Sequence, residues 1–357
     1  MYYPVRNPYA QQQGSSCCCL ILLFTFILTC SFIGFYFVTE HSFSSSLTFN
    51  FAKDPEIGAA FSDFMIKFDK TYATQEETLY RYRVFADNYR RINEFNADPE
   101  QTSTVEVNMF ADLTDEEFKK LYLPRTIARG SEVEEDYVPS IKDLDISWEH
   151  RITPVKDQGM CGSCWAFSSI SVVETLIAIK SNKSAVSYSE QELVDCCNGP
   201  PYPESNGCNG GEDEDALKYI IEKGISMTVD YPYFAIDKEC KVDKLEKVKK
   251  ITGQKPIKDI DAMEEAIGKQ TISVGVAAGH IAFRFYKNGI VTKGCPGDDI
   301  THAVTVIAAK KEGSTPYWLV RNSWGKNWGD SGNIKIMRTD GCGLCGINCH
   351  SRIPTIS

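Results

Sequence analysis

Apolar residues recur at helical spacing in two segments of the N-terminal half of the chain. Phe61, Phe64, Met65 and Phe68 lie three to four residues apart, and a second periodic run spans about residues 75–96. This spacing places the apolar side chains of each segment on one helical face. The pattern therefore predicts two packed helices.

A different pattern lies nearer the N-terminus, where 22 consecutive residues, 17–38, are mostly apolar and carry no charge. Such a run can cross about 30 Å of hydrocarbon. A cleaved signal peptide is the alternative, although its apolar core usually has about 7 to 15 residues. Arg6 is the only charged residue ahead of the run, so the positive-inside rule leaves the head in the cytosol. We expect a cytosolic head at 1–16, a single-pass type II transmembrane signal anchor at 17–38 and a spacer at 39–55.

The predicted helix at 75–96 carries polar residues in register with its apolar ones. Six positions spaced by three or four residues share one stripe of a helix; they are Glu77, Arg81, Phe85, Asn88, Ile92 and Asn96. Taken alone, the stripe is typical of an amphipathic helix. We expect Glu77 and Arg81, four residues apart, to form an ion pair within it.

Composition narrows the class of protein. The formal net charge of −10 argues against a nucleic-acid partner, because a phosphate-binding surface needs an excess of Lys and Arg. Ten of the fourteen cysteines fall between residues 161 and 349, which favours an oxidising compartment. Residues 123–141 turn to proline, charge and little periodicity, which is typical of a linker.

The most specific chemical motif surrounds Cys164. It reads Gln158-Gly-Met-Cys-Gly-Ser-Cys-Trp and leads into an apolar segment with helical spacing. A thiol at a helix N-terminus faces unpaired amides and a positive dipole end, which lower its pKa and make it reactive. A redox Cys-x-x-Cys pair, a structural disulfide and a zinc site completed by Cys342 and Cys345 are the alternatives. A redox pair of this kind should follow a strand in a βαβ pattern, and no such pattern precedes the motif. The cysteine spacing does not require a zinc site either, so no metal or cofactor is expected.

Two further candidate residues, a histidine and an asparagine, follow Cys164 far along the sequence. His302 begins a strand-like segment 138 residues after Cys164, and Asn322 follows at 158. His302 alone would be interpreted as a buried core histidine. Together with the Cys-Gly-Ser-Cys-Trp motif, this order resembles the papain-like cysteine peptidases, in which His and Asn follow about 130 to 150 residues downstream.

The N-terminal helices extend this resemblance. The six-residue stripe matches the Glu-Arg-Phe-Asn-Ile-Asn motif of the inhibitory propeptide of cathepsin L-like relatives. Asn108, Phe110 and Asp112 follow at the usual distance, whereas Glu106 departs from the family's glycine. The resemblance thus runs from about residue 56 to the C-terminus.

The resemblance implies an α+β, two-lobe papain-like fold. Its helical lobe would span about residues 150–255, and its β-rich lobe would carry His302 and Asn322. It also implies an inhibitory propeptide at 56–122, a linker with the maturation cleavage at 123–141 and a peptidase domain at 142–357. The propeptide would block the cleft between the lobes until an acidic compartment loosens it.

The same resemblance assigns catalytic roles. Cys164 would be the nucleophile, His302 its base, and Asn322 the residue that orients His302. The Gln158 side chain and the Cys164 backbone N–H would form an oxyanion hole. Thr301 departs from the Asn or Asp that relatives commonly carry there, which bears on how His302 titrates.

The resemblance also implies a disulfide pairing and a set of substrate-binding residues. The implied disulfides are Cys161–Cys208, Cys196–Cys240 and Cys295–Cys345, with Cys342–Cys349 as a suggested fourth bridge and Cys197 left as an odd thiol. The implied substrate-binding residues are Gly210, Gly211, Glu212, Asp213, Ala303, Trp324 and His350, with Gly275 and Ile300 beside them. Trp324 would also cover the Asn322–His302 bond.

The acidic pair Glu212 and Asp213 is unusual where relatives have apolar or aromatic residues. We hypothesise that basic substrate side chains are accepted there, because opposite charges attract in a partly buried site. The alternative is that the pair only caps a helix at 214–221.

The expected protein is therefore a cysteine endopeptidase zymogen that acts on proteins and peptides. Its partners would be its own propeptide, cystatin-type inhibitors and the membrane. We expect it in a lysosome or lysosome-like vacuole, reached through the secretory pathway, with secretion as the alternative. Asn182-Lys-Ser is a glycosylation sequon consistent with a lumenal domain. A catalytically inactive scaffold and a peptide ligase on the same fold are the rival functions.

Overall fold

The computed structural model describes residues 54–125, 141–242 and 251–356. The expected cytosolic head, the signal anchor at 17–38 and nearly all of the spacer lie outside these residues. Among the described residues, only the helix Cys164–Ser181 is long and apolar enough to cross a membrane, and most of it is buried inside the protein.

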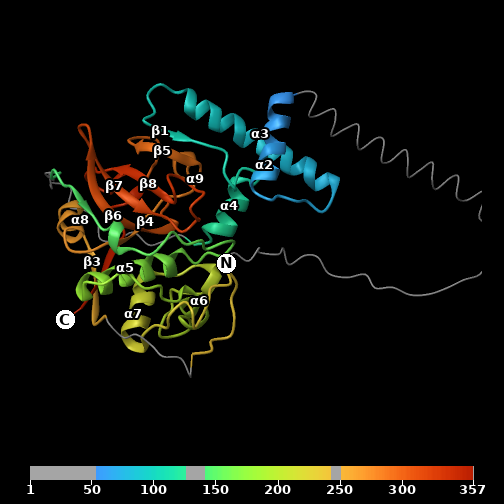
Figure 1. The fold of residues 1–357 in the computed structure, drawn as a ribbon. Helices are drawn as coiled ribbons and strands as arrows, with labels where there is room; N and C mark the ends of the chain where they lie inside the picture. The colour runs from blue at the N-terminus through green and yellow to red at the C-terminus, as the bar shows by residue number, and fades with distance from the viewer. Residues whose placement is uncertain (1–53, 126–140, 243–250, 357) are drawn as a thin grey trace, which may run out of the picture. The chain divides into compact units, whose positions relative to one another are not determined.

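The described chain begins with helices and ends with a run of strands (Figure 1). The α-helices are α2 (Pro55–Lys67), α3 (Gln75–Ala97), α4 (Asp115–Tyr122), α5 (Cys164–Ser181), α6 (Glu190–Cys196), α7 (Asp213–Lys223), α8 (Ile260–Ile267) and α9 (Ile281–Arg284). The strands are β1 (Ser103–Val105), β2 (Ile146–Ser147), β3 (Gly253–Ile257), β4 (Ile272–Val276), β5 (Tyr286–Val291), β6 (His302–Glu312), β7 (Thr315–Arg321), β8 (Asn333–Met337) and β9 (Ser351–Thr355).

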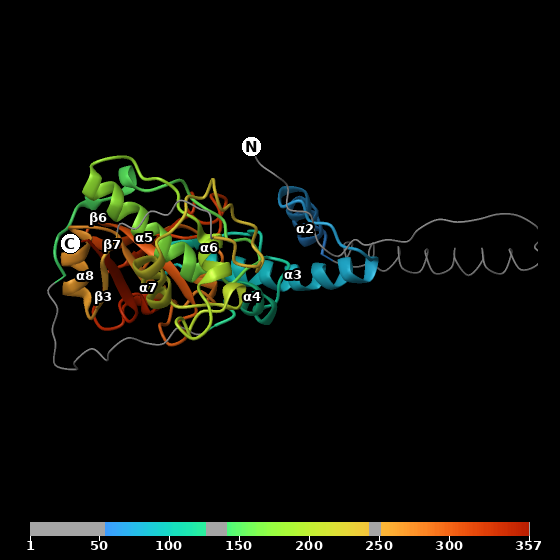
Figure 2. The ribbon, with the colours of Figure 1, turned by 90° about the horizontal axis from the view of Figure 1, so that it is seen from below.

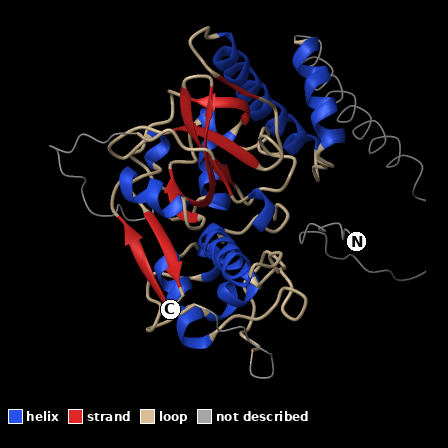
Figure 3. Cartoon of the chain, turned by 60° about the vertical axis from the view of Figure 1, so that its left-hand side comes forward, coloured by secondary structure: helices blue, strands red, loops and turns tan. Residues whose placement is uncertain are grey.

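The described strands form one sheet. Its order is β1-β5-β8-β7-β6-β4-β9-β3, with β2 paired to β6. The pairs are antiparallel except β5 with β8. Figure 3 shows most of the strands gathered in one part of the peptidase region and helices grouped in the other. The predicted α+β arrangement, with His302 opening a strand of the β-rich lobe, is confirmed.

The helical lobe is built around α5. This helix is apolar on almost every side, and a helix of that kind must be buried. Trp165, Ile170, Val173 and Leu176 are all buried in one core cluster. Side chains of α6 and α7 complete the same cluster. The predicted helix that begins at Cys164 is thereby confirmed, and its N-terminus is held rigidly.

The predicted stripe on α3 also folds as an amphipathic helix. Phe85 and Ile92 are buried, and the amide of Asn88 donates to the carbonyl oxygens of Ala111 and Leu113, each at 2.9 Å. The polar positions of the stripe therefore bind the returning chain. Figure 2 shows α3 beside α4 and extending away from the peptidase helices.

One detail of this stripe was predicted wrongly. Arg81 does not pair with Glu77; its guanidinium lies 2.8 Å from the carboxylate of Glu117 and 3.0 Å from the carbonyl oxygen of Asp112. The Glu77 carboxylate accepts instead from the backbone N–H of Ala73 at 3.0 Å. Tertiary partners have displaced a local ion pair, because an exposed pair within a helix contributes only about 0.2–0.5 kcal/mol.

The segment after α3 joins the sheet of the peptidase region. Strand β1 pairs antiparallel with β5, and Ser103 lies opposite Gly289. Arg284, at the end of α9, then binds the next turn of the segment: its guanidinium donates to the carbonyl oxygens of Phe110 and Leu113 and pairs with Asp115 at 2.8 Å. Arg284 is almost fully buried. The N-terminal helical segment is thus docked by backbone pairing and by a buried cation.

Four disulfides are present among the described residues. They join Cys161 with Cys208, Cys196 with Cys240, Cys295 with Cys345, and Cys342 with Cys349. Within the same residues, Cys164 and Cys197 are the cysteines without a disulfide, and both are buried. The bridges close loops of 44 to 50 residues in three cases, the length for which cross-linking restricts the unfolded chain strongly.

Two neighbouring glutamates on α8 offer a stability test. Glu264 and Arg338 form an ion pair at 2.7 Å with both side chains fully buried, whereas Glu265 pairs with Lys269 at the surface. Glu264→Ala should lower the free energy of unfolding by about 3–5 kcal/mol, because it leaves a buried guanidinium unpaired. Glu265→Ala should leave the urea midpoint unchanged. Equal midpoints for the two variants would contradict the burial of the Glu264–Arg338 pair.

Candidate active site

Cys164 is the first residue of α5 and keeps a free thiol. Its side chain is 6% exposed. Cys161 is bonded to Cys208 and Cys345 to Cys295. The two residues of the Cys-x-x-Cys motif therefore do not pair with each other. Three of the four cysteines considered for a zinc site, Cys161, Cys342 and Cys345, are held in disulfides. The thiol of Cys164 is left for other chemistry.

His302 begins β6 and binds Asn322. The Nε2 atom of His302 lies 2.7 Å from Oδ1 of Asn322, and both side chains are buried. Because an amide oxygen only accepts, Nε2 carries the proton in the neutral ring. Nδ1 is then the basic nitrogen, and it has no hydrogen-bond partner within the described part of the chain. The neutral ring can accept a proton at Nδ1.

Trp324 covers this hydrogen bond. Its ring stacks on His302 with centroids 4.6 Å apart and an interplanar angle of 27°. Trp324 is 1% exposed, so water is kept from that side of the imidazole. A hydrogen bond shielded from water is electrostatically stronger than an exposed one.

The loop before α5 is fastened to the segment that carries Asn322. The backbone N–H of Gln158 donates to the carbonyl oxygen of Ser323 at 2.8 Å, and Ser323 Oγ donates to Gln158 Oε1 at 2.6 Å. The Gln158 Nε2 atom donates to the carbonyl oxygen of Cys161 at 2.8 Å. These bonds fix the position of the Gln158 side chain in the loop that leads to Cys164.

Lys156 anchors the same loop to the helical lobe. Its ammonium lies 2.6 Å from a carboxylate oxygen of Glu174 on α5 and 2.5 Å from one of Glu190 on α6. All three side chains are largely buried. An ion pair of this kind depends strongly on its geometry, so the loop that carries Gln158 has little freedom.

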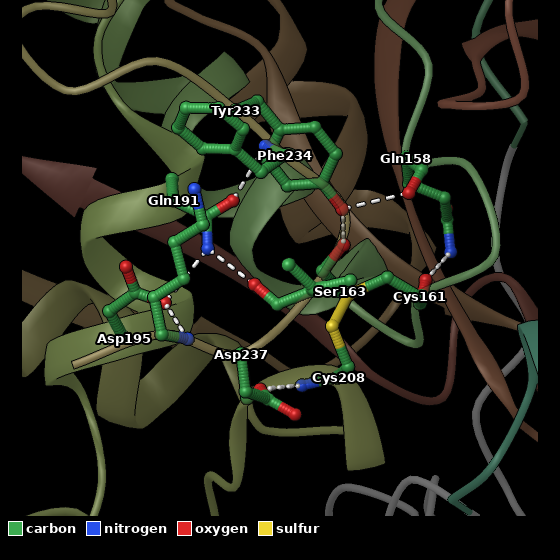
Figure 4. Close-up of a disulfide and its surroundings, with 12 residues drawn as sticks. Gln158, Cys161, Ser163, Gln191, Asp195, Cys208, Tyr233, Phe234 and Asp237 are labelled. Carbon is green, nitrogen blue, oxygen red and sulfur yellow. Dashed lines mark hydrogen bonds between the residues drawn. A yellow bond between two sulfur atoms is a disulfide. The ribbon is translucent and has the colours of Figure 1, made fainter. Parts of the chain in front are cut away.

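Figure 4 shows how the Cys161–Cys208 disulfide sits in this region. The Tyr233 hydroxyl donates to the carbonyl oxygen of Gln158 at 2.8 Å and shares a hydrogen bond of 2.6 Å with Ser163 Oγ. Sequence reasoning missed Tyr233, because it lies 75 residues from Gln158 and no local pattern marks it.

The electrostatics of the site differ from the sequence-based expectation. Burial raises the pKa of Cys164 to about 11, although the backbone N–H groups of Ala303 and Trp165 favour the thiolate. Burial also lowers the pKa of His302 to about 4, against the effect of its bond to Asn322. The predicted low thiol pKa is therefore wrong for this state of the protein, because loss of solvation outweighs the effect of these backbone N–H groups. Near pH 7 both groups are neutral.

The N-terminal segment lies against the residues that the sequence suggested for substrate binding. A Cβ added to Gly162 would lie 2.3 Å from Cγ of Pro124, and one added to Gly210 would lie 2.7 Å from Cβ of Arg125. Gly210 has a φ of 104°, which only glycine adopts readily. Pro124 therefore lies against Gly162, and Arg125 lies against Gly210. The expected cleavage region beyond residue 125 lies outside the described residues until residue 141.

Other residues suggested for the pocket contact one another near Cys164. Ile300 and Ala303 pack with Cys164 in one cluster. A Cβ on Gly275 would meet Ile300 and His350. These positions come from α5, β4, the start of β6 and the loop before β9, so the fold assembles them from four separate parts of the chain.

The acidic pair lies at the start of α7. His350 Nε2 is 3.1 Å from Asp213 Oδ1 and 3.7 Å from Glu212 Oε2. Glu212 occupies the N-cap position, but its side chain makes no capping hydrogen bond. The capping alternative is therefore not what holds Glu212, since its carboxylate turns toward His350.

Two known protein families match this sequence. Residues 139–355 match the family described as papain family cysteine protease, and residues 61–118 match the cathepsin propeptide inhibitor domain. The chain belongs to the papain family of cysteine proteases. It is a papain-family hydrolase in zymogen form, with its inhibitory propeptide ahead of the peptidase domain.

The relatives include both sequences and solved structures. Cathepsin L 1 of Paramecium tetraurelia is 35% identical over 294 residues, covering 80% of this chain and 89% of that protein. The recombinant stem bromelain precursor has a TM-score of 0.74 at 32% identity and covers 85% of this chain and all of that one. The bromelain protease from Ananas comosus, solved in complex with the E64 inhibitor, has a TM-score of 0.55 at 35% identity and covers 60% and 99% of the two chains.

In this papain-family zymogen the propeptide packs on the tryptophan that shields His302. The rings of Phe110, Phe118 and Tyr122 meet Trp324 edge-on at centroid distances of 5.0, 5.6 and 6.5 Å. Such aromatic contacts contribute beyond their buried area. The propeptide thus covers Trp324, and through it the candidate catalytic residue His302, by aromatic packing.

The raised thiol pKa generates a test on the zymogen. A Cys197→Ser variant keeps one free thiol among the described residues. In this variant the rate at which iodoacetamide alkylates Cys164 should rise with pH, with a midpoint at about pH 11. For an ordinary cysteine thiol this midpoint lies at about pH 8.5. Mass spectrometry of timed samples gives the rate at each pH. A zymogen midpoint below that of an ordinary thiol would contradict the neutral pair.

Proposed function

We propose that Cys164 is the nucleophile of a cysteine endopeptidase, His302 its general base and acid, and Asn322 the residue that orients His302. The observation that carries this proposal is the 2.7 Å bond between His302 Nε2 and Asn322 Oδ1. It leaves Nδ1 as the basic nitrogen of the ring, in the strand that packs against the Cys164 thiol.

The chemistry proceeds in two steps. The thiol proton passes from Cys164 Sγ to His302 Nδ1, and the thiolate attacks the scissile carbonyl carbon. The tetrahedral intermediate collapses with cleavage of the C–N bond, and the imidazolium gives its proton to the leaving amine. Water, deprotonated by the neutral imidazole, then hydrolyses the thioester and regenerates the thiol.

The oxyanion of each tetrahedral intermediate needs donors. We assign these to the Cys164 backbone N–H and to Gln158 Nε2, whose amide carries two N–H bonds and uses one on the Cys161 carbonyl oxygen. Ser323 holds the other end of the amide at Oε1. Removing one donor of this kind typically costs about 10²–10³ in rate.

Release of the propeptide, residues 56–122, would uncover the site. The ion pair of Asp115 with the buried Arg284 guanidinium is one of the contacts that must break on release, and we propose that an acidic compartment promotes this release. We place the maturation cleavage within 123–141. The uncovered dyad is solvated, which removes the main cause of its neutral state.

An acidic endomembrane lumen suits such an activation. The four disulfides support an oxidising route through the secretory pathway. We propose a lysosome or lysosome-like vacuole as the destination, with the precursor anchored by residues 17–38 and with secretion as the alternative. Protein and peptide substrates and cystatin-type inhibitors would be the partners of the mature enzyme.

Covalent labelling tests the nucleophile. Because the related bromelain protease was solved with E64, the acid-activated enzyme should take up one E-64 molecule on Cys164 and lose its peptidase activity. Intact mass and peptide mapping give the stoichiometry and the position. Cys164→Ser should take up none, whereas Cys197→Ser should label like the unaltered enzyme. Absence of labelling on a folded, propeptide-free enzyme would refute the proposal.

Asn322→Ala tests the orienting role. It removes the acceptor for His302 Nε2–H, so kcat should fall about 10- to 100-fold with little change in KM, because the imidazole loses its alignment. Kinetics on a fluorogenic peptide measure both constants. The exposed Asn198 provides a matched control, and Asn198→Ala should keep full activity. Product analysis with an added amine nucleophile distinguishes hydrolysis from peptide ligation.

A further inference from the structure

One tyrosine hydroxyl joins the loop that carries Gln158 to the helix that carries Cys164. The Tyr233 hydroxyl donates to the carbonyl oxygen of Gln158 at 2.8 Å and lies 2.6 Å from Ser163 Oγ. A phenol has one hydrogen to donate, and Tyr233 uses it on Gln158, so the Ser163 hydroxyl donates to Tyr233. Loss of solvation raises the pKa of Tyr233 well above its usual value, so the hydroxyl keeps its proton in any cellular compartment.

This arrangement keeps Ser163 from the usual role of its position. Ser163 is the N-cap residue of α5, yet its side chain makes no capping hydrogen bond to the helix. A free serine hydroxyl at this position accepts from the second or third N–H of the helix, which here belong to Trp165 and Ala166. The N–H of Ala166 is already bonded to the carbonyl oxygen of Ser163 at 2.9 Å. A released Ser163 hydroxyl would therefore cap Trp165.

The N–H of Trp165 has another partner to serve. Together with the N–H of Ala303, it favours the thiolate form of Cys164. A hydrogen bond to the charged form of a group lowers the pKa of that group. Capping by Ser163 would compete for this donor. Because Tyr233 holds the Ser163 hydroxyl, the Trp165 N–H stays available to the sulfur.

The same hydroxyl fixes the loop that carries the candidate oxyanion donor. Gln158 Nε2 donates to the carbonyl oxygen of Cys161, and Ser323 Oγ donates to Gln158 Oε1. These bonds orient the Gln158 side chain, but its position also depends on the main chain from which it projects. The bond from Tyr233 to the Gln158 carbonyl oxygen holds that main chain.

The segment that carries Tyr233 is itself held by α6 (Figure 4). Gln191 is fully buried on α6, and its Oε1 accepts from the backbone N–H of Phe234 at 2.8 Å. Its Nε2 donates to the carbonyl oxygen of Ile236 at 2.7 Å. The Tyr233 ring meets the Phe167 ring of α5 edge-on, with centroids 4.8 Å apart. The position of the hydroxyl is therefore set by both helices.

We propose that Tyr233 is a positioning residue for the peptidase reaction and acts on two parts of the site through one hydroxyl. It keeps Ser163 from capping α5, which leaves the Trp165 N–H for the Cys164 thiolate. It also holds Gln158 in place for the oxyanion. The role is indirect, because Tyr233 acts through these residues rather than on the substrate. The inference rests on the proposed roles of Cys164 and Gln158 and goes beyond them, since it names a distant residue on which both depend.

The pKa of the Cys164 thiol is the most specific readout of this role. In the described residues the thiol is bordered by His302 at the start of β6 and by Tyr233, and it feels the charge of Glu212 at the N-cap of α7. Tyr233→Phe changes none of these charges, because the phenol is neutral. A change in the thiol pKa then reports a change in hydrogen bonding.

Tyr233→Phe removes the hydroxyl and keeps the ring that packs on Phe167. On the acid-activated enzyme, kcat for a fluorogenic peptide should fall about tenfold with KM unchanged, because misplaced reacting groups cost rate rather than substrate binding. The pH midpoint for alkylation of Cys164 by iodoacetamide should rise by about one pH unit, because the thiolate loses one hydrogen-bond donor. Peptide mapping assigns the alkylation to Cys164.

Further variants separate the two parts of the proposal. In Ser163→Ala/Tyr233→Phe no hydroxyl can cap Trp165, so the thiol midpoint should return to that of the unaltered enzyme. Its kcat should stay low, because the bond to the oxyanion loop is still missing. Ser163→Ala alone should keep the unaltered thiol midpoint. Tyr202 provides a matched control: it is buried in the same lobe and donates to Glu222 at 2.9 Å, so Tyr202→Phe should lower the urea midpoint without changing kcat or the thiol midpoint.

Each result decides the question. If kcat and the thiol midpoint of Tyr233→Phe equal those of Tyr202→Phe, the role of Tyr233 is structural only and the proposal is overturned. A shifted thiol midpoint in Ser163→Ala also overturns it, even if Tyr233→Phe fails to fold, because the serine hydroxyl would then already act on α5. A midpoint that stays raised in the double variant assigns the effect to another group, with the same consequence. Absence of peptide cleavage by the unaltered enzyme would instead contradict the peptidase function, so the two failures are distinguishable.

Discussion

Exclusion of water from the hydrogen bond between His302 and Asn322 is the constraint on which the site depends. Trp324 provides this cover by stacking on the imidazole. The bond fixes which nitrogen of the ring is basic. Because Trp324 excludes water, solvent does not replace Asn322 as the hydrogen-bond partner of the imidazole. The loop that carries Gln158 is then aligned by its backbone bond to Ser323, the residue between Asn322 and Trp324. One short segment therefore organises both lobes.

The propeptide inhibits by using the same cover. Its aromatic residues pack on Trp324 from outside, and its strand β1 extends the sheet next to β5. The buried guanidinium of Arg284 binds the turn between them. These contacts differ in physical type, since one is apolar packing, one is backbone pairing and one is ionic.

Burial by this arrangement sets the electrostatic state of the dyad. The thiol and the imidazole are both driven toward their neutral forms, since a charged pair is costly in a site without water. The helix N-terminus at Cys164 favours the thiolate but does not compensate for lost solvation. The candidate nucleophile is thus both covered by the propeptide-packed Trp324 and protonated in the zymogen.

The sequence by itself determined the helix α3, the helix that begins at Cys164 and the strand that begins at His302. It did so because helical periodicity and short motifs are local, and a chain spacing of three or four residues has the same meaning in any fold. The family resemblance then supplied cysteine pairs and residue roles that no spacing could provide. Only the tertiary structure decided that Arg81 binds Glu117, that β1 joins β5, that Tyr233 holds Gln158 and that His350 meets Asp213. Such partners lie tens to hundreds of residues apart, and the thiol pKa depends on how much solvent they exclude. Neither contacts between distant residues nor the exclusion of solvent produces a periodic pattern in the sequence, so both are determined only by the folded structure.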